Sequence, residues 1–217
     1  MIIRAVLFDL DHTLGIDHNL EASVLEQIAK EFPYLISKDK LRASLNDFQS
    51  GKISLVKMFS SLFPDQDKIR LKTLVKEYKK KCLKKAAASF TPLPGTEKTI
   101  KTLLKKKIPL GILSNGWEEL QKAKAQAIGF PGAVITSQEI GAWKPDPRSF
   151  HLALEKCDFF LSTTLFVGDS PEMDIAGAKR SGMAAGWLNP ENKPFPVKGL
   201  DPDFILNSLV DLLQILF

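Results

Sequence analysis

Residues 2–13 read IIRAVLFDLDHT, an almost unbroken apolar run that ends in two carboxylates, Asp9 and Asp11. A continuous run of Ile, Val, Leu and Phe is typical of a parallel strand that is covered on both faces. The two carboxylates would follow that strand directly, at the edge of the sheet where α/β proteins bind their ligands. Another interpretation stays open at this point, because a DxD pair after a strand can also be a polar turn that caps a helix.

Similar apolar stretches recur along the chain and alternate with helical patterns. Further strands are expected at residues 108–113, 133–136, 165–167, 184–188 and 204–206. Helices are expected at residues 96–107, 118–128, 147–157, 171–181 and 208–216. Pro147 and Pro171 suit the first turns of their helices, where a missing N–H costs little. This alternation predicts an α/β fold with a doubly wound parallel sheet.

Residues 15–91 interrupt the alternation, because they contain helical patterns alone, at residues 20–31, 38–48, 53–62 and 68–87. We therefore expect a core of residues 1–14 and 92–217 and an inserted helical lobe of residues 15–91. The helical lobe carries 15 Lys and Arg against 9 Asp and Glu, so the excess positive charge of the chain lies there. Tyr78 and Cys82 share an apolar helix face, which predicts that the lysines around them face water. A nucleic-acid footprint would use the same lysines, but we expect no nucleic-acid partner.

The composition, 44% hydrophobic and 25% charged residues, is that of an ordinary globular protein. Every apolar run falls short of the roughly 20 residues that span a bilayer, so we expect no membrane association. The first apolar run has no basic leader or small-residue cleavage site, and Cys82 and Cys157 form no CxxC pair. These features favour the cytoplasm, and we expect a monomer or a homodimer.

Asp9 and Asp11 suit two roles in phosphoryl transfer. A carboxylate such as Asp9 can attack phosphorus and form an aspartyl-phosphate. Asp11 can protonate the departing oxygen and later take a proton from the hydrolytic water. Thr13 can hold one of the carboxylates by a hydrogen bond from its hydroxyl.

Further polar residues follow the other apolar stretches. Asp169, expected opposite Asp9, would complete an all-oxygen site of the kind Mg²⁺ prefers. Asp174 can orient Lys144 or a metal-bound water, or can simply favour the dipole of its helix. Ser114 and Asn115 open a turn toward a helix, which is either an anion site or a plain helix cap. A Lys144 ammonium fixed between stiff proline residues would neutralise the charge on a transferring phosphoryl group.

Four motifs in this order, each at or near the end of an apolar stretch, make the chain resemble the haloacid dehalogenase-like (HAD) hydrolase superfamily. They are residues 9–13 (DLDHT), residues 114–116 (SNG), Lys144-Pro145, and Gly168-Asp169 with Asp174. The resemblance covers the whole chain. An insert after the first motif is similar to subfamily I members with a small α-helical cap, so the resemblance implies a Rossmann-like core with residues 15–91 as the cap.

The resemblance also implies a role for each matching residue. Asp9 would be the nucleophile and Asp11 the acid/base. The phosphate would be bound by Ser114, Asn115 and Lys144. A Mg²⁺ cofactor would be held by the Asp9 carboxylate, the Asp11 main-chain carbonyl and Asp169, with Thr13 and Asp174 in support. His12 stands where many members carry Gly.

The dehalogenases of this family lack an acidic residue two positions after the nucleophile and use no metal, so Asp11 with Asp169 favours phosphoryl transfer. We expect a Mg²⁺-dependent phosphomonoesterase that acts on a small phosphorylated metabolite, most like nucleoside 5′-monophosphatases and acylneuraminate-9-phosphatases. Specificity is expected to lie in the helical lobe, near residues 46–52. Four alternatives stay open: a phosphonatase using Lys30, Lys38 or Lys52, a pyrophosphatase, a sugar-phosphate mutase, and a non-catalytic binding protein on the same scaffold.

Overall fold

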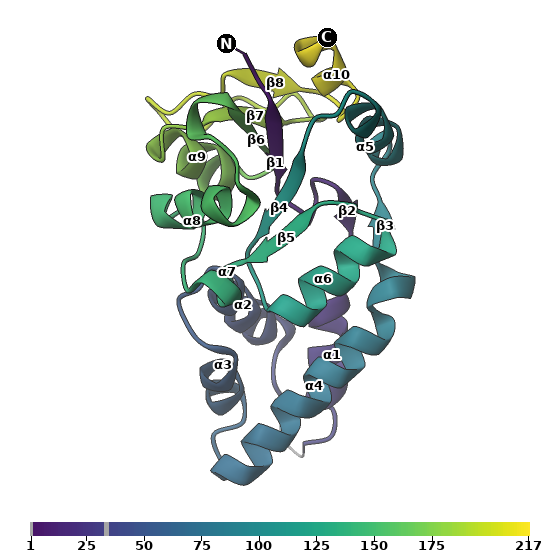
Figure 1. The fold of residues 1–217 in the computed structure, drawn as a ribbon. Coiled ribbons are helices and arrows are strands. Elements are labelled where there is room, and N and C mark those ends of the chain that lie inside the picture. Colours follow the sequence, from purple (N-terminus) through teal and green to yellow (C-terminus); the bar gives the residue numbers. More distant parts are fainter. Residues whose placement is uncertain (1, 33–34) are drawn as a thin grey trace.

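The computed structural model describes residues 2–32 and 35–217. A six-stranded sheet lies at its centre, in the order β5-β4-β1-β6-β7-β8, with every neighbouring pair parallel (Figure 1). The strands are β1 (Ala5–Phe8), β4 (Leu110–Ser114), β5 (Ala133–Thr136), β6 (Thr164–Gly168), β7 (Ala184–Leu188) and β8 (Phe204–Leu206). Strand β1 is central, and the chain winds outward from it first on one side and then on the other. The predicted α/β fold with a doubly wound parallel sheet is confirmed.

Helices cover both faces of the sheet because successive side chains of a strand point to opposite faces. Val6 and Phe8 of β1 pack in one hydrophobic cluster, with side chains from α5 (Thr96–Lys105), α6 (Glu118–Ala127) and α10 (Asp211–Leu216). Leu7 packs in the other cluster, with side chains from α8 (Pro147–Cys157) and α9 (Gly177–Arg180). A buried strand between two apolar layers explains the unbroken apolar run in the sequence.

The segment after β6 differs from the expected single α-helix over residues 171–181. It forms a π-helix over Pro171–Ala176, followed by α9. The Ser170 carbonyl accepts from both the Asp174 and the Ile175 N–H, at 3.0 and 3.2 Å. The second bond joins residues five positions apart, which is the spacing that defines the wider turn of a π-helix. This turn places the Asp174 carboxyl against Gly168, where an added Cβ would lie 2.5 Å from Asp174 Oδ2. Two short helices, α7 (Ser137–Ile140) and a 3-10 helix at Leu161–Thr163, and two short strands described next were not predicted.

Two short antiparallel strands join the core to the helical lobe. Gly15 of β2 (Gly15–Ile16) pairs with Pro92 of β3 (Thr91–Pro92), so the chain enters and leaves the helical lobe at one place. Between these strands lie α1 (Leu20–Ala29), α2 (Lys38–Gln49), α3 (Leu55–Leu62) and α4 (Lys68–Ser89). The four helices lie below the sheet in Figure 1, and both chain termini lie at the opposite end.

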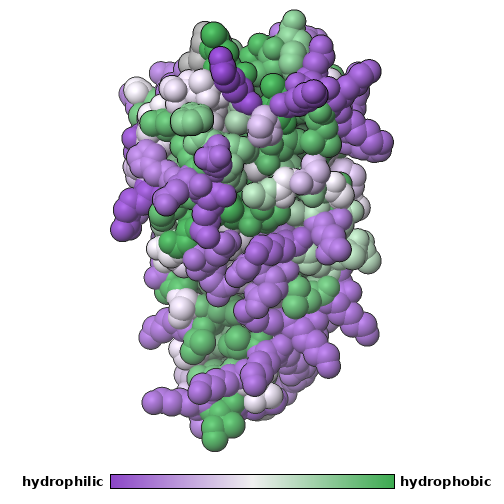
Figure 2. Space-filling view, in the orientation of Figure 1, coloured by the Kyte–Doolittle hydropathy of each residue, from purple (hydrophilic) through white to green (hydrophobic). Residues whose placement is uncertain are grey.

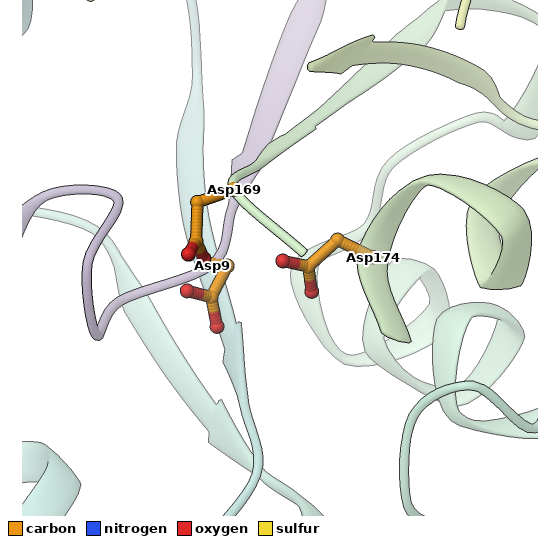
Figure 3. A group of neighbouring side chains, drawn as sticks. All are labelled: Asp9, Asp169 and Asp174. Atoms are coloured by element: carbon orange, nitrogen blue, oxygen red, sulfur yellow. The ribbon is translucent and has the colours of Figure 1, made fainter. Parts of the chain in front are cut away.

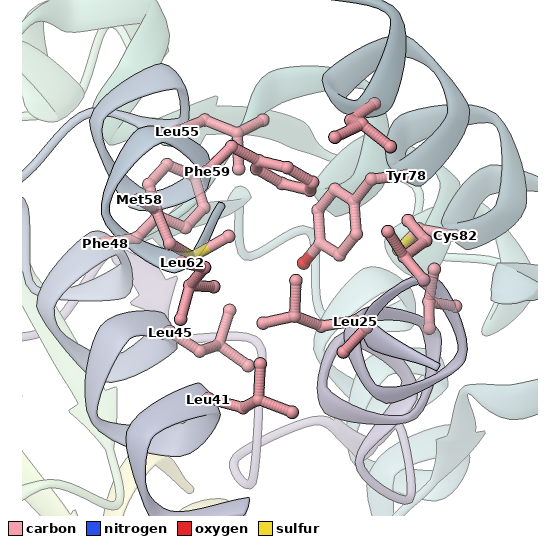
Figure 4. Close-up of a cluster of buried hydrophobic side chains, with 14 of the residues drawn as sticks. Leu25, Leu41, Leu45, Phe48, Leu55, Met58, Phe59, Leu62, Tyr78 and Cys82 are labelled. Atoms are coloured by element: carbon pink, nitrogen blue, oxygen red, sulfur yellow. The ribbon is translucent and has the colours of Figure 1, made fainter. Parts of the chain in front are cut away.

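The helical lobe has a hydrophobic core of its own (Figure 4). Leu25, Phe59 and Tyr78 point into the space between its helices. Trp117, which directly precedes α6 in the core, packs in the same cluster, so the core and the helical lobe share buried surface. On α4 the predicted apolar face is confirmed, because Tyr78 and Cys82 are buried, while hydrophilic side chains dominate the visible face of the helical lobe (Figure 2). Across the described ranges, no helix combines the length and apolarity needed to cross a bilayer.

Candidate active site

The sequence-predicted residues meet at the carboxyl edge of the central strands. Phe8, the last residue of β1, pairs with Ile112 of β4 and with Val167 of β6, so the three strands end within two residues of one another. Asp9, Ser114 and Asp169 stand at or directly after those ends. The Asp9 N–H donates to the Val167 carbonyl over 2.8 Å, which fixes the start of the loop that carries Asp11.

Three carboxylates form an acidic trio at this edge: Asp9, Asp169 and Asp174 (Figure 3). One oxygen from each lies within 4.8 Å of the others. The Thr13 hydroxyl donates to Asp169 Oδ1 over 3.4 Å, so it holds a carboxylate as expected, though by a long bond. Clustered carboxylate oxygens are the donors that Mg²⁺ takes, so the residues present fit this ion.

Lys144 reaches into the acidic trio from the loop before α8. Its Nζ lies 2.6 Å from Asp9 Oδ1 and 2.7 Å from Asp174 Oδ1, and the residue is 2% exposed. The Asn115 side chain holds the Lys144 main chain at both ends, because its Oδ1 accepts the Lys144 N–H and its Nδ2 donates to the Lys144 carbonyl. Ser137 Oγ donates to the same Asn115 Oδ1 over 2.5 Å. Asn115 therefore orients Lys144, a contact that its expected phosphate-binding role did not include.

Burial and the repulsion between neighbouring carboxyls raise the pKa of two members of the acidic trio, Asp9 and Asp169. Burial, with Asp174 nearby, raises the pKa of Asp9 to about 7 even though Lys144 opposes the shift. Burial, with Asp174 and Asp9 nearby, raises the pKa of Asp169 to about 8. Burial lowers the pKa of Lys144, but Asp174 and Asp9 outweigh it and leave that pKa above its usual range. A divalent cation would favour the ionised form of both carboxyls.

Asp11 stands apart from the acidic trio. Its Oδ1 lies 2.8 Å from Lys124 Nζ, and its Oδ2 accepts from Gln121 Nε2 over 2.8 Å. The same Gln121 Nε2 lies 2.7 Å from Ser114 Oγ, so the carboxylate is held beside the expected phosphate site. Burial raises the pKa of Asp11, but Lys124 and Gln121 outweigh it and lower that pKa below its usual value. The expected metal contact through the Asp11 main-chain carbonyl stays a prediction.

A tight turn carries Asp11 to this position. His12 has a φ of 63°, in the left-handed region that few side chains adopt, and its N–H donates to the Gly15 carbonyl over 2.7 Å. A residue without a Cβ would fit this position without strain. Gln121 and Lys124 were not predicted from the sequence as site residues. Both lie on α6, the helix that follows Ser114, and their three-residue spacing places them on one face of that helix.

The site opens into a cavity of about 650 Å³ between the core and the helical lobe. From the helical lobe its wall includes Arg42, Asn46 and Lys52, so part of the stretch expected to set specificity does face the site. Lys30 and Lys38 instead line a second cavity of about 410 Å³, together with Phe32, Leu35 and Ile36. Neither of these lysines is therefore placed to act on a ligand of the acidic trio.

The model of the haloacid dehalogenase-like hydrolase family matches residues 3–182, most of the chain. The chain belongs to the haloacid dehalogenase-like hydrolases. The predicted superfamily and the prediction of a hydrolytic enzyme are thereby confirmed.

Curated relatives of this HAD-like hydrolase include small-metabolite phosphatases. The chain is 29% identical over 174 residues to the pyrimidine 5′-nucleotidase YjjG of Escherichia coli (strain K12), and the aligned region covers 78% of this chain and 76% of that protein. It is 26% identical to a glyceraldehyde 3-phosphate phosphatase of Pyrococcus furiosus, covering 99% of this chain and 93% of that protein. Among solved structures, a 2-haloacid dehalogenase from Pseudomonas syringae has the same fold, with a TM-score of 0.77, 23% identity and coverage of 99% and 98%.

Proposed function

We propose that this HAD-like hydrolase is a Mg²⁺-dependent phosphomonoesterase that hydrolyses a small phosphorylated metabolite through an aspartyl-phosphate. The observation that carries the proposal is the contact of Lys144 with Asp9 and Asp174, beside Asp169. A buried ammonium against a buried carboxylate provides both a nucleophile and a cation for the phosphoryl oxygens. Asp11 adds the acidic group that phosphoryl transfer requires and dehalogenation in this family does not use.

The first step forms a bond between an Asp9 carboxylate oxygen and phosphorus and breaks the bond from phosphorus to the leaving oxygen. Lys144 holds Asp9 Oδ1, so Oδ2 is the oxygen we assign to the attack. The leaving oxygen takes a proton from Asp11 and departs as an alcohol. Ser114, beside Asp11 through Gln121, is positioned to contact the phosphoryl oxygens.

The second step returns the enzyme to its starting state. Water attacks the phosphorus of the aspartyl-phosphate and gives a proton to Asp11, and the bond from phosphorus to the Asp9 oxygen breaks to release inorganic phosphate. Asp9 and Asp169 would hold the Mg²⁺, with Asp174 and Thr13 in support. When bound, the ion neutralises phosphoryl charge and keeps the carboxylates ionised.

The helical lobe is proposed as the cap that selects the substrate. A cavity of about 650 Å³ is within the usual range for small-molecule sites and suits a nucleoside monophosphate or a sugar phosphate. Arg42 is exposed on the cavity wall, where it can meet an anionic or polar part of the leaving group. Relatives named as a nucleotidase and a glyceraldehyde 3-phosphate phosphatase support the same substrate class.

The test is a phosphate-release screen over nucleotides, sugar phosphates, phosphoglycolate, pyrophosphate and phosphonates, with Mg²⁺ and with EDTA. Asp9→Asn should abolish turnover and capture of beryllofluoride while thermal unfolding stays close to that of the unmodified protein. Asp158→Asn is the matched control, because this exposed carboxylate directly follows α8 and does not line the site cavity, and Asn tolerates its left-handed φ of 55°. Turnover that persists in folded Asp9→Asn, or in EDTA, would refute the proposal.

A further inference from the structure

Lys124 is a buried cation that the two steps above do not use. The residue is 1% exposed, and its Nζ lies 2.8 Å from Asp11 Oδ1 and 2.8 Å from Asp17 Oδ2. Its Nζ also lies 5.7 Å from the centroid of the Phe90 ring. Burying an ammonium costs free energy because the group loses its hydration, and ion pairs with buried partners must compensate for that loss. Lys124 is therefore tied to a fixed set of neighbours and is no incidental surface lysine.

The partners of Lys124 come from three parts of the fold. Asp11 belongs to the active site, and Asp17 directly follows β2, on the way into the helical lobe. Phe90 directly precedes β3, on the way back to the core. Lys124 itself lies on α6 of the core. One side chain thus connects the catalytic loop to both chain crossings between the core and the helical lobe.

The nearby buried carboxylate Glu21 does not require Lys124. Tyr78 Oη and Trp117 Nε1 donate to Glu21 Oε1 at 2.9 and 3.1 Å, and Gln49 Nε2 donates to Glu21 Oε2 at 2.8 Å. Three donors satisfy that carboxylate without an ammonium in contact. The direct ion pairs of Lys124 are with Asp11 and Asp17.

Lys124 and Gln121 hold different oxygens of the Asp11 carboxylate. The ammonium holds Oδ1, and Gln121, one helical turn earlier, bonds Oδ2 and also Ser114 Oγ. Oδ2 is therefore the oxygen on the phosphate side. A side chain free to rotate would offer either oxygen at varying distances, and small displacements of an acid/base group cost rate.

We propose that Lys124 is a positioning residue for the acid/base step, holding Asp11 Oδ1 and linking it to Asp17 so that Oδ2 faces the leaving group. This inference rests on the proposed function. It predicts a loss of kcat that depends on how much protonation help the leaving group needs. Substrate binding should change little, because Lys124 contacts the phosphate site only through Asp11.

The experiment measures single-turnover release of the leaving group, with an aryl phosphate that departs readily and with an alkyl phosphate that needs a proton. Lys124→Met should slow the alkyl ester about 100-fold or more and the aryl ester less than about tenfold, with KM within about threefold, because general acid help is worth about 10²–10⁴-fold. Lys124→Arg should restore much of the difference. Lys122→Met is the matched control, since Lys122 lies on the same helix and pairs with Glu118 at the surface.

A double variant separates positioning from general support of the fold. In an Asp11→Asn background, Lys124→Met should cause no further loss, because the group that it positions is gone. If Lys124→Met fails to fold, Asp17→Asn with Lys124→Arg carries the test, with a smaller loss of the same leaving-group dependence. Equal losses on both esters, or full additivity with Asp11→Asn, would overturn the inference. An inactive unmodified protein would instead overturn the proposed phosphatase.

Discussion

The affinity of the site for Mg²⁺ should rise steeply between about pH 6 and about pH 8. Burial and neighbouring carboxylates raise the pKa of Asp9 to about 7 and that of Asp169 to about 8. Mg²⁺ requires ionised oxygen ligands, so it must displace the protons that these carboxyls hold at lower pH. The contact of Lys144 with Asp9 lowers the pKa of Asp9, but the effect of burial is larger.

The magnitude follows from the two pKa values. At about pH 6 Asp9 is about ten parts protonated to one ionised, and Asp169 about a hundred to one. At about pH 8 Asp9 is almost fully ionised and Asp169 about half ionised. If both protons must leave independently, the apparent affinity rises about 500-fold over this range, or about 4 kcal/mol of binding free energy.

The assay is a calorimetric Mg²⁺ titration at constant ionic strength, repeated in buffers of different ionisation enthalpy to count the protons released. Asp169→Asn leaves Asp9 as the group that must ionise, so the pH dependence should fall to about tenfold. Without metal, the folded state keeps protons that the unfolded state loses above about pH 4, so the free energy of unfolding should decrease as the pH rises toward 8. A Mg²⁺ affinity that changes less than about threefold from pH 6 to 8 would refute the reasoning.

Three further changes probe the helical lobe. Gly51→Ala forces a side chain onto a φ of 76° and a Cβ to within 2.4 Å of the Trp143 ring, so thermal unfolding should show a loss of about 1–3 kcal/mol. Tyr78→Phe removes a donor from buried Glu21 and should lower the free energy of unfolding in urea by about 1–3 kcal/mol. Arg42→Ala should raise KM several-fold for esters that carry a second anionic group and leave neutral esters unchanged in steady-state kinetics. The opposite result in any one of these assays would contradict the contact on which it rests.

Much of the fold, and the meeting of Asp9 with Asp169, follow from local sequence pattern. The apolar runs before Asp9 and before Asp169 predict buried strands from their own residues alone, and both are buried strands in the structure. Parallel strands end at one edge, so the order of apolar runs is enough to bring these carboxylates and Ser114 together. The π-helix that directs Asp174 toward Lys144 was not predictable in this way, since it depends on packing against Gly168.

The burial of Lys124 and the identity of its counterions could not be predicted from the sequence pattern. In α6, helical spacing places Lys124 on the face of Leu120 and Gln121 and Lys122 off that face, but the two lysines carry the same charge and the pattern names no counterion for either. The Lys122 side chain is 49% exposed and the Lys124 side chain 1% exposed, because the helical lobe and its two crossings cover only the second. The counterion Asp17 comes from one of those crossings, so the helical lobe supplies part of the environment that fixes Asp11. A displacement of the helical lobe therefore changes the setting of the acid/base as well as access to the cavity.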